Sequence, residues 1–391
     1  MTMRNFMRGT AVSLFALAAM PAFAQQAPVK IGMITTLTGP GAYLGQDIRD
    51  AFKLAIDQEG GKLGGVPVEL VVEDDALKPG QGKSIAEKML KNDKIKLFTG
   101  IVFSNVAGAV VPDVVDADGI YVSPNAAPSN LAGKECNKNY FVVSWQNDTL
   151  HESAGQNAQN QGYKKAFILA PNYQAGKDAL TGFKRFFKGE IVGEVYTRLD
   201  QTDYAAEIAQ IRAANPDVVF QFHPGGLGIA FLRQYQQAGL LDKIPMVVPS
   251  PSMDQTTTKA VGDAALGIKV SAQWNTDLDN PANKEFMAAW TKAYNRLPTY
   301  YASQGYDTAK LIASALKATN GKVDDDAFVK ALKKADFSSV RGKFKFGNNN
   351  HPIQDWYALE VVKGADGQPT IKTVGKIFQE QGDVYAKDCK L

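Results

Sequence analysis

The sequence predicts an α/β protein made of two units, each a mainly parallel β-sheet with helices on both faces. Three observations support this prediction. β-Strand patterns alternate with amphipathic helix patterns, which is typical of parallel sheets. This alternation starts a second time near residue 164. The chain has 391 residues, which is long for a single hydrophobic core.

The first half of the chain contains four strand patterns separated by helix patterns. The strand patterns are short runs rich in β-branched and apolar residues, at 29–36, 68–72, 97–101 and 120–122. The first helix pattern is the clearest, because Ile48, Phe52 and Ile56 recur at helical spacing. Two more helices are predicted around 85–90 and 106–115.

The second half repeats this alternation without repeating the sequence itself. Strands are predicted at 166–170, 191–195, 217–222, 246–248 and 268–272, and helices at 179–187, 204–212 and 227–237. Asn215-Pro216 ends one of these helices and Gly239 ends another. Later segments predict helices at 284–297 and 303–318, strands at 342–346 and 356–362, and a polar tail. We expect the material after residue 268 to return to the first unit.

The N-terminus has the pattern of a secretory signal peptide. Arg4 and Arg8 precede an apolar run that is too short to span a bilayer, and Ala22-Phe23-Ala24 forms a small-x-small cleavage site. We therefore expect cleavage after Ala24, removal of residues 1–24, and export to the periplasm of a Gram-negative cell.

The net charge limits which partners the protein can bind, and the cysteine content bears on the compartment in which it works. The formal net charge is only +3 and no basic block stands out, which argues against nucleic acid or an anionic membrane surface as a partner. The chain has two cysteines, Cys136 and Cys389. In an oxidising compartment we favour a disulfide between them over two free thiols.

The turn LTGPGAYLG at 37–45 nearly matches a dinucleotide-binding fingerprint. Its spacing is one residue longer than G-x-G-x-x-G, and the acidic run that starts at Glu73 follows Gly39 later than the fingerprint requires. We therefore interpret the glycines as permitting a tight turn from strand to helix. The start of that helix would face the cleft that parallel sheets form at the carboxyl ends of their strands.

No catalytic or metal-binding constellation is apparent. The three histidines, His151, His223 and His351, lack metal-ligand spacing, and neither a G-x-S-x-G elbow nor a phosphate-binding P-loop occurs. We expect no cofactor, no metal and no enzymatic activity.

Several segments together resemble the leucine/isoleucine/valine-binding family of periplasmic solute-binding proteins, the receptors of ABC importers. The similar segments cover nearly all of the chain after the signal peptide: VKIGMITTLTGPGAYLGQDIRDAFKLAIDQ, VELVVEDDALKPGQGKSIAEKML, FTGIVFSNVAGAVVPDVVDADGIYVSPNAAPSNLAG, APNYQAGKDALTGFKRFF, DYAAEIAQIRAANPDVVFQF, LRQYQQAGL and YDTAKLIASAL. Each segment alone is weak evidence for the family, whereas the order and spacing of all the segments together are specific to it.

The resemblance implies a two-lobed type I periplasmic binding fold with three hinge crossings, near 145–149, 273–276 and 348–353. The N-terminal lobe would comprise 28–146 with 275–350, and the C-terminal lobe 147–274 with 351–391. It also implies that the lobes close on a small ligand and then dock, as a monomer, on permease subunits in the inner membrane.

The resemblance also implies which residues touch the ligand. Ser104 corresponds to the serine that binds a ligand carboxylate. The other corresponding positions are Asn125, Ala126 and Ala127 after the fourth strand, Tyr173 in the second lobe, Phe222 and His223 after DVVFQF, and Ser250 in VVPSPSMD.

Two of these positions depart from the amino-acid binders. Ala127 stands where a threonine is usual, and Ser250 stands where an acidic residue pairs with the ligand ammonium. A buried ammonium without such a partner is very costly. The site thus keeps the elements for a carboxylate and lacks those for an amine.

Aromatic residues at predicted strand ends favour a planar ligand. The candidates are Tyr43, Phe103, Tyr173, Phe222, and Trp145 or Trp274. We therefore predict a benzoate- or hydroxycinnamate-like acid, with His223 hydrogen-bonded to a ring hydroxyl, and the chain resembles the aromatic-acid-binding branch of the family. Branched-chain amino acids are the alternative ligand. A sensor ectodomain of the same fold and an exported enzyme are the alternative classes.

Overall fold

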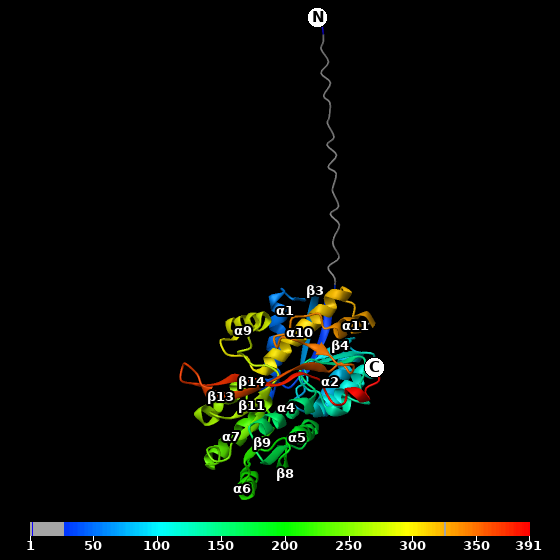
Figure 1. The fold of residues 1–391 in the computed structure, drawn as a ribbon. Helices are drawn as coiled ribbons and strands as arrows, with labels where there is room; N and C mark the ends of the chain where they lie inside the picture. The colour runs from blue at the N-terminus through cyan, green and yellow to red at the C-terminus, as the bar shows by residue number, and fades with distance from the viewer. Residues whose placement is uncertain (1, 3–26, 324–325) are drawn as a thin grey trace.

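The computed structural model describes residues 2, 27–323 and 326–391. The expected signal peptide and its cleavage site lie outside the described residues, apart from residue 2. The described chain forms two β-sheets flanked by helices, which confirms the predicted type I periplasmic binding fold (Figure 1).

The first sheet has the strand order β2-β3-β1-β4-β5-β6. Its strands are β1 (Val29–Thr35), β2 (Lys62–Leu63), β3 (Val66–Asp74), β4 (Leu97–Thr99), β5 (Ile120–Ser123) and β6 (Tyr140–Val142). Every pairing is parallel except that of the short β2 with β3. The helices between these strands are α1 (Ala42–Gln58), α2 (Pro79–Lys91) and α3 (Ser104–Asp116).

Three later helices pack on this first sheet, as the sequence predicts for the material after residue 268. They are α9 (Pro281–Tyr294), α10 (Tyr300–Thr319) and α11 (Asp326–Lys334). Helix α10 lies against α1 (Figure 1). The buried carboxylate of Asp47 on α1 accepts hydrogen bonds from Arg296 and from the Thr299 hydroxyl, which fixes the start of α10.

The second sheet has the order β12-β13-β11-β10-β9-β7-β8, and β14 pairs with β13. The strands are β7 (Lys165–Pro171), β8 (Glu190–Thr197), β9 (Val218–Gln221), β10 (Met246–Pro249), β11 (Lys269–Ala272), β12 (Lys345–Phe346), β13 (Pro352–Lys363) and β14 (Pro369–Gln381). Its helices are α4 (Asn147–Asn160), α5 (Gln174–Phe186), α6 (Ala205–Ala214), α7 (Gly226–Gln237) and α8 (Gln255–Val261). The strands from β7 to β11 pair in parallel, whereas β12, β13 and β14 join the sheet antiparallel.

The chain passes between the two sheets three times, near the predicted hinge segments. These passages follow β6, β11 and α11. The buried guanidinium of Arg341 joins two of them, because its Nη1 donates to the carbonyls of Val143 and Ser144 and to Gln354 Oε1 at 2.6, 3.0 and 2.7 Å. Asp307 on α10 pairs with the same guanidinium at 3.2 Å, so a buried charge has the partner it requires.

The glycine turn at 37–45 allows the start of α1 to pack closely against the end of β1. A Cβ atom on Gly45 would lie 2.1 Å from the Thr36 carbonyl oxygen, so only glycine lets α1 start this close to β1. The Pro40 carbonyl in the same turn accepts a hydrogen bond from the Gly226 N–H at 3.2 Å, at the start of α7 in the other unit.

The predicted disulfide between Cys136 and Cys389 is confirmed. Their Cα atoms lie 5.7 Å apart, and the bond closes a loop of 253 positions. Within residues 27–323 and 326–391, no helix is both long enough and apolar enough to cross a bilayer.

Candidate functional site

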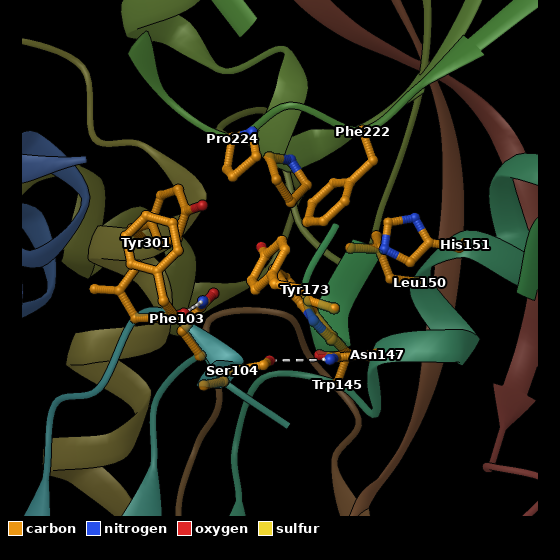
Figure 2. Close-up of a pocket in the computed structure, with 15 residues that line it drawn as sticks. Phe103, Ser104, Trp145, Asn147, Leu150, His151, Tyr173, Phe222, Pro224 and Tyr301 are labelled. Carbon is orange, nitrogen blue, oxygen red and sulfur yellow. Dashed lines mark hydrogen bonds between the residues drawn. The ribbon is translucent and has the colours of Figure 1, made fainter. Parts of the chain in front are cut away.

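A cavity lies between the two sheets, beside the carboxyl ends of their parallel strands, where ligands of open α/β sheets bind. The space that protein atoms leave unfilled there, open solvent included, is about 350 Å3. The residues that line it are Val102, Phe103, Ser104, Asn125, Ala126, Trp145, Asn147, Leu150, His151, Tyr173, Ala175, Phe222, Pro224, Pro251 and Tyr301 (Figure 2).

Three helices begin at this cavity. Ser104 is the first residue of α3, Asn147 is the first residue of α4, and Tyr173 is the N-cap of α5. The first N–H groups of a helix lack intrahelical partners and carry partial positive charge. Convergence of three such ends favours an anion, and a carboxylate fits this requirement.

Asn147 organises the polar wall. Its Nδ2 donates to Ser104 Oγ at 3.1 Å, as Figure 2 shows, and to Asp178 Oδ2 at 2.9 Å. Because Ser104 Oγ accepts this bond, its own proton is free to be donated toward the cavity.

Asp178 lies behind this wall, outside the lining, and joins the two units. Ser129 donates its N–H and its hydroxyl to the Asp178 carboxylate at 3.1 and 2.7 Å, and Gln174 Nε2 donates at 2.8 Å. Burial, assisted by the nearby charge of Asp148, raises the pKa of Asp178 to about 6.

Aromatic rings form the apolar walls. Tyr173 and Phe222 are nearly parallel, at 13° and 6.3 Å between ring centroids, and Phe103 lies 6.4 Å from Tyr173. Trp145 and Tyr301 complete the lining (Figure 2). Flat rings arranged in this way suit a planar ligand.

His151 also lines the cavity, one turn of α4 after Asn147. Its ring packs edge-on against Phe222 at 4.7 Å, and its buried Nδ1 has no hydrogen-bond partner among the described residues. Burial lowers the pKa of His151 to about 3, so the ring is uncharged at neutral pH.

Sequence reasoning did not select His151, because the polar sequence of α4 carries no apolar stripe. The only available signal was its place in NDTLH, four residues after an asparagine in a predicted hinge.

The structure brings most of the expected site residues together. Those in the lining are Phe103, Ser104, Asn125, Ala126, Tyr173, Phe222 and Trp145. Tyr43, Ala127, His223, Ser250 and Trp274 lie outside it.

The residues outside the lining have other partners or positions. The Tyr43 hydroxyl donates to Asp254 Oδ2 at 2.9 Å, and the Ala127 carbonyl accepts from the Asn147 N–H at 3.1 Å. Trp274 Nε1 donates to Asn283 at 2.8 Å. Ser250 is buried just after β10, and its hydroxyl has no hydrogen-bond partner among the described residues.

His223 faces away from the cavity although its neighbour Phe222 faces it. Successive side chains at a strand end point to opposite sides, which separates the pair. Both ring nitrogens of His223 have partners, Thr197 Oγ1 at 3.0 Å and Gln221 Oε1 at 2.9 Å, and its ring stacks on Phe231.

The sequence places Ser250 where amino-acid binders have an acidic residue that pairs with the ligand ammonium. The lining of the cavity contains no acidic side chain at any other position either. All the lining residues given above are uncharged side chains. Asp254, the nearest acid along the chain, caps α8 by accepting the Thr257 N–H at 2.7 Å, and burial raises its pKa to about 6. Among the described residues, no cluster of three or more His, Cys, Asp or Glu side chains suits a metal ion.

Residues 28–368 match the family model described as periplasmic binding protein. Among curated proteins, the Leu/Ile/Val-binding protein homolog 6 of Brucella melitensis is 29% identical over 388 residues, which cover 96% of this chain and 97% of the relative.

Two solved structures of R. palustris ABC-transporter solute-binding proteins share the fold. One, in complex with benzoate, is 30% identical with a TM-score of 0.88 and covers 93% of this chain and 100% of that one. The other, in complex with 4-hydroxybenzoate, is 28% identical with a TM-score of 0.85 and covers 92% and 99%.

Proposed function

The chain belongs to the periplasmic binding protein family, which makes it an ABC-type solute-binding protein and not an enzyme, and we propose that its solute is an aromatic carboxylate. The protein captures this acid between its two lobes and delivers it to the permease of an ABC importer. We further propose that it is exported after cleavage at Ala24 and acts in the periplasm as a monomer.

One observation carries this proposal: the cavity combines three helix N-termini with aromatic walls and has no acidic side chain in its lining. The helix N-termini and the Ser104 hydroxyl supply donors for a carboxylate. The rings supply a flat apolar slot. An α-ammonium would find no carboxylate among these lining residues.

The two R. palustris proteins bind benzoate and 4-hydroxybenzoate, which supports an aromatic carboxylate as the ligand of this chain. The names of the Brucella relatives favour the second candidate, a branched-chain amino acid. That ligand would need the ammonium partner which the lining lacks.

Lobe closure is part of the proposal. The N-terminal lobe comprises 28–146 with 275–350, and the C-terminal lobe comprises 147–274 with 351–391. The bond between Tyr43 and Asp254 and the bonds between Ser129 and Asp178 then each join one lobe to the other.

A thermal-shift screen of refolded, ligand-free protein tests the ligand class. A ligand present at 100 times its Kd adds about 2.7 kcal/mol to the free energy of unfolding. We expect benzoate, hydroxybenzoates or hydroxycinnamates to raise the melting temperature, and leucine, isoleucine and valine to leave it unchanged. Stabilisation by leucine alone would remove the aromatic assignment and leave the transport role.

A further inference from the structure

We propose that His151 is a specificity-determining residue that selects aromatic acids carrying a ring hydroxyl, by hydrogen-bonding that hydroxyl at the end of the ligand away from Ser104. This inference rests on the proposed function and names the substrate class more narrowly.

The position of His151 on α4 sets the distance between the two polar ends of the ligand. Asn147 contacts Ser104 at the end that binds the carboxylate, and His151 follows four residues later on the same face of the helix. One helical turn rises about 5.4 Å. We infer that a substituted benzene ring with its carboxylate at Ser104 would place a hydroxyl about one helical turn further along α4, beside His151.

The His151 ring lines the cavity and carries a buried nitrogen without a hydrogen-bond partner among the described residues, so a ligand hydroxyl beside the ring would supply a hydrogen bond that the protein does not. His151 is 1% exposed and lines the cavity, yet its Nδ1 has no partner among the described residues. A buried polar atom without a hydrogen bond is costly. A ligand hydroxyl can both donate and accept, so it pairs with the ring in either tautomer.

The environment of the ring favours a hydroxyl over a second carboxylate. Phe222 and Phe220 pack edge-on against the ring, at 4.7 and 5.9 Å, and Leu150 is its neighbour in the lining. These apolar contacts hold the pKa of His151 at about 3, so the ring carries no charge to attract an anion. A neutral polar substituent fits this end of the cavity.

His223 provides a matched comparison. It is a second buried, uncharged histidine, and both of its ring nitrogens already have partners outside the cavity. A substitution there removes an imidazole without changing the cavity lining.

The test measures dissociation constants for benzoate, 3-hydroxybenzoate and 4-hydroxybenzoate by calorimetry. The proteins are the wild type, His151→Leu and His223→Leu. We expect the wild type to bind at least one hydroxybenzoate about tenfold more tightly than benzoate. In His151→Leu that preference disappears, because the Kd for the preferred hydroxybenzoate rises more than the Kd for benzoate does. In His223→Leu the preference remains.

Three results would overturn the inference: no preference in the wild type, a preference that survives in His151→Leu (equal loss of all three ligands included), or its loss in His223→Leu. A preference that survives would assign the hydroxyl to another group, such as Tyr173 or Tyr301. If none of the three acids binds the wild type, the inference falls, and the thermal-shift screen with hydroxycinnamates then decides whether the proposed aromatic ligand class falls with it.

A second measurement uses unmodified protein, in case His151→Leu does not fold. Histidine-ring 15N shifts are recorded by NMR and assigned by comparing the three histidines. The preferred hydroxybenzoate should move the His151 ring signals relative to the benzoate complex and leave those of His223 in place. Identical His151 shifts in both complexes would contradict the proposed hydrogen bond.

Discussion

Asn147 and Asp178 show how single side chains connect the ligand site with contacts between the two units. Asn147 donates both to Ser104, which faces the cavity, and to Asp178, which faces Ser129 of the other unit. Ser104 is therefore one hydrogen bond from Asn147 and two from the buried Asp178 carboxylate. Ligand binding and the contact between units thus share one hydrogen-bond network.

The raised pKa of Asp178 predicts a defined pH dependence. A carboxyl whose pKa rises from 3.8 to about 6 on folding stabilises the protein below pH 3.8, and this contribution is lost as the pH rises through 6. Between pH 5 and pH 7.5 the loss is about 1 kcal/mol. Asp178→Asn cannot ionise, so its melting temperature relative to wild type should be higher at pH 7.5 than at pH 5.

Thermal melts at pH 5 and pH 7.5 measure this difference in melting temperature between variant and wild type. Asp242 is exposed, and Asp242→Asn serves as the control, for which we expect the same difference from wild type at both pH values. The change is read as a difference between the two pH values, so any constant cost of the asparagine cancels. An Asp178→Asn difference that does not vary with pH would show that Asp178 does not titrate as described.

At the scale of elements, most strands and most helices were predictable because their apolar periodicity is strong. Strand β1 and helix α1 follow directly from it, whereas β4 and β9 end earlier than predicted, at Thr99 and Gln221. Helix α4 was not predictable as a site element, since its sequence is polar although nearly every residue of its first two turns is buried. Burial of a polar helix depends on partners far away in the sequence, such as Asp178 and Ser104.

Tertiary contacts determine two further features that the sequence pattern did not predict, namely strand β14 and the direction of the His223 side chain. The segment after Lys363 was expected to be a polar tail, and 369–381 instead forms β14 on β13. The pairing partner, rather than the intrinsic preference of the segment, determines this strand. The direction of His223 similarly depends on where β9 ends, which the sequence pattern locates only approximately.

The C-terminal segment contacts parts of both units. The Tyr385 hydroxyl donates to Asp148 on α4 at 2.9 Å, Asn348 Nδ2 donates to the Ala386 carbonyl at 2.7 Å, and Cys389 is bonded to Cys136. The disulfide fixes this segment against the loop before β6.

Replacing both cysteines, Cys136→Ser with Cys389→Ser, should lower the free energy of unfolding by about 2–5 kcal/mol, because the cross-link restricts the unfolded chain. Denaturant unfolding under non-reducing conditions measures this loss. Reduction should destabilise the wild type and leave the double variant unchanged. Equal stability of the two oxidised proteins would contradict a structural role for the bond.

At the scale of the whole molecule, direct contacts join the two units on several sides of the cavity. Tyr43 reaches Asp254, Pro40 reaches Gly226, and Ser129 reaches Asp178. The residues that make these bonds lie outside the cavity lining, to which the aromatic walls and the starts of the three helices belong. Under the proposed function, closure of the lobes would enclose a ligand between these donors and the flat rings.

The most direct test of this account is a crystal structure of the protein with 4-hydroxybenzoate. We expect the carboxylate within hydrogen-bonding distance of the Ser104 hydroxyl and the first N–H groups of α3, with the ring packed against Tyr173 and Phe222. A ligand in the reversed orientation, a ligand outside this cavity, or a cavity that binds only leucine would contradict it.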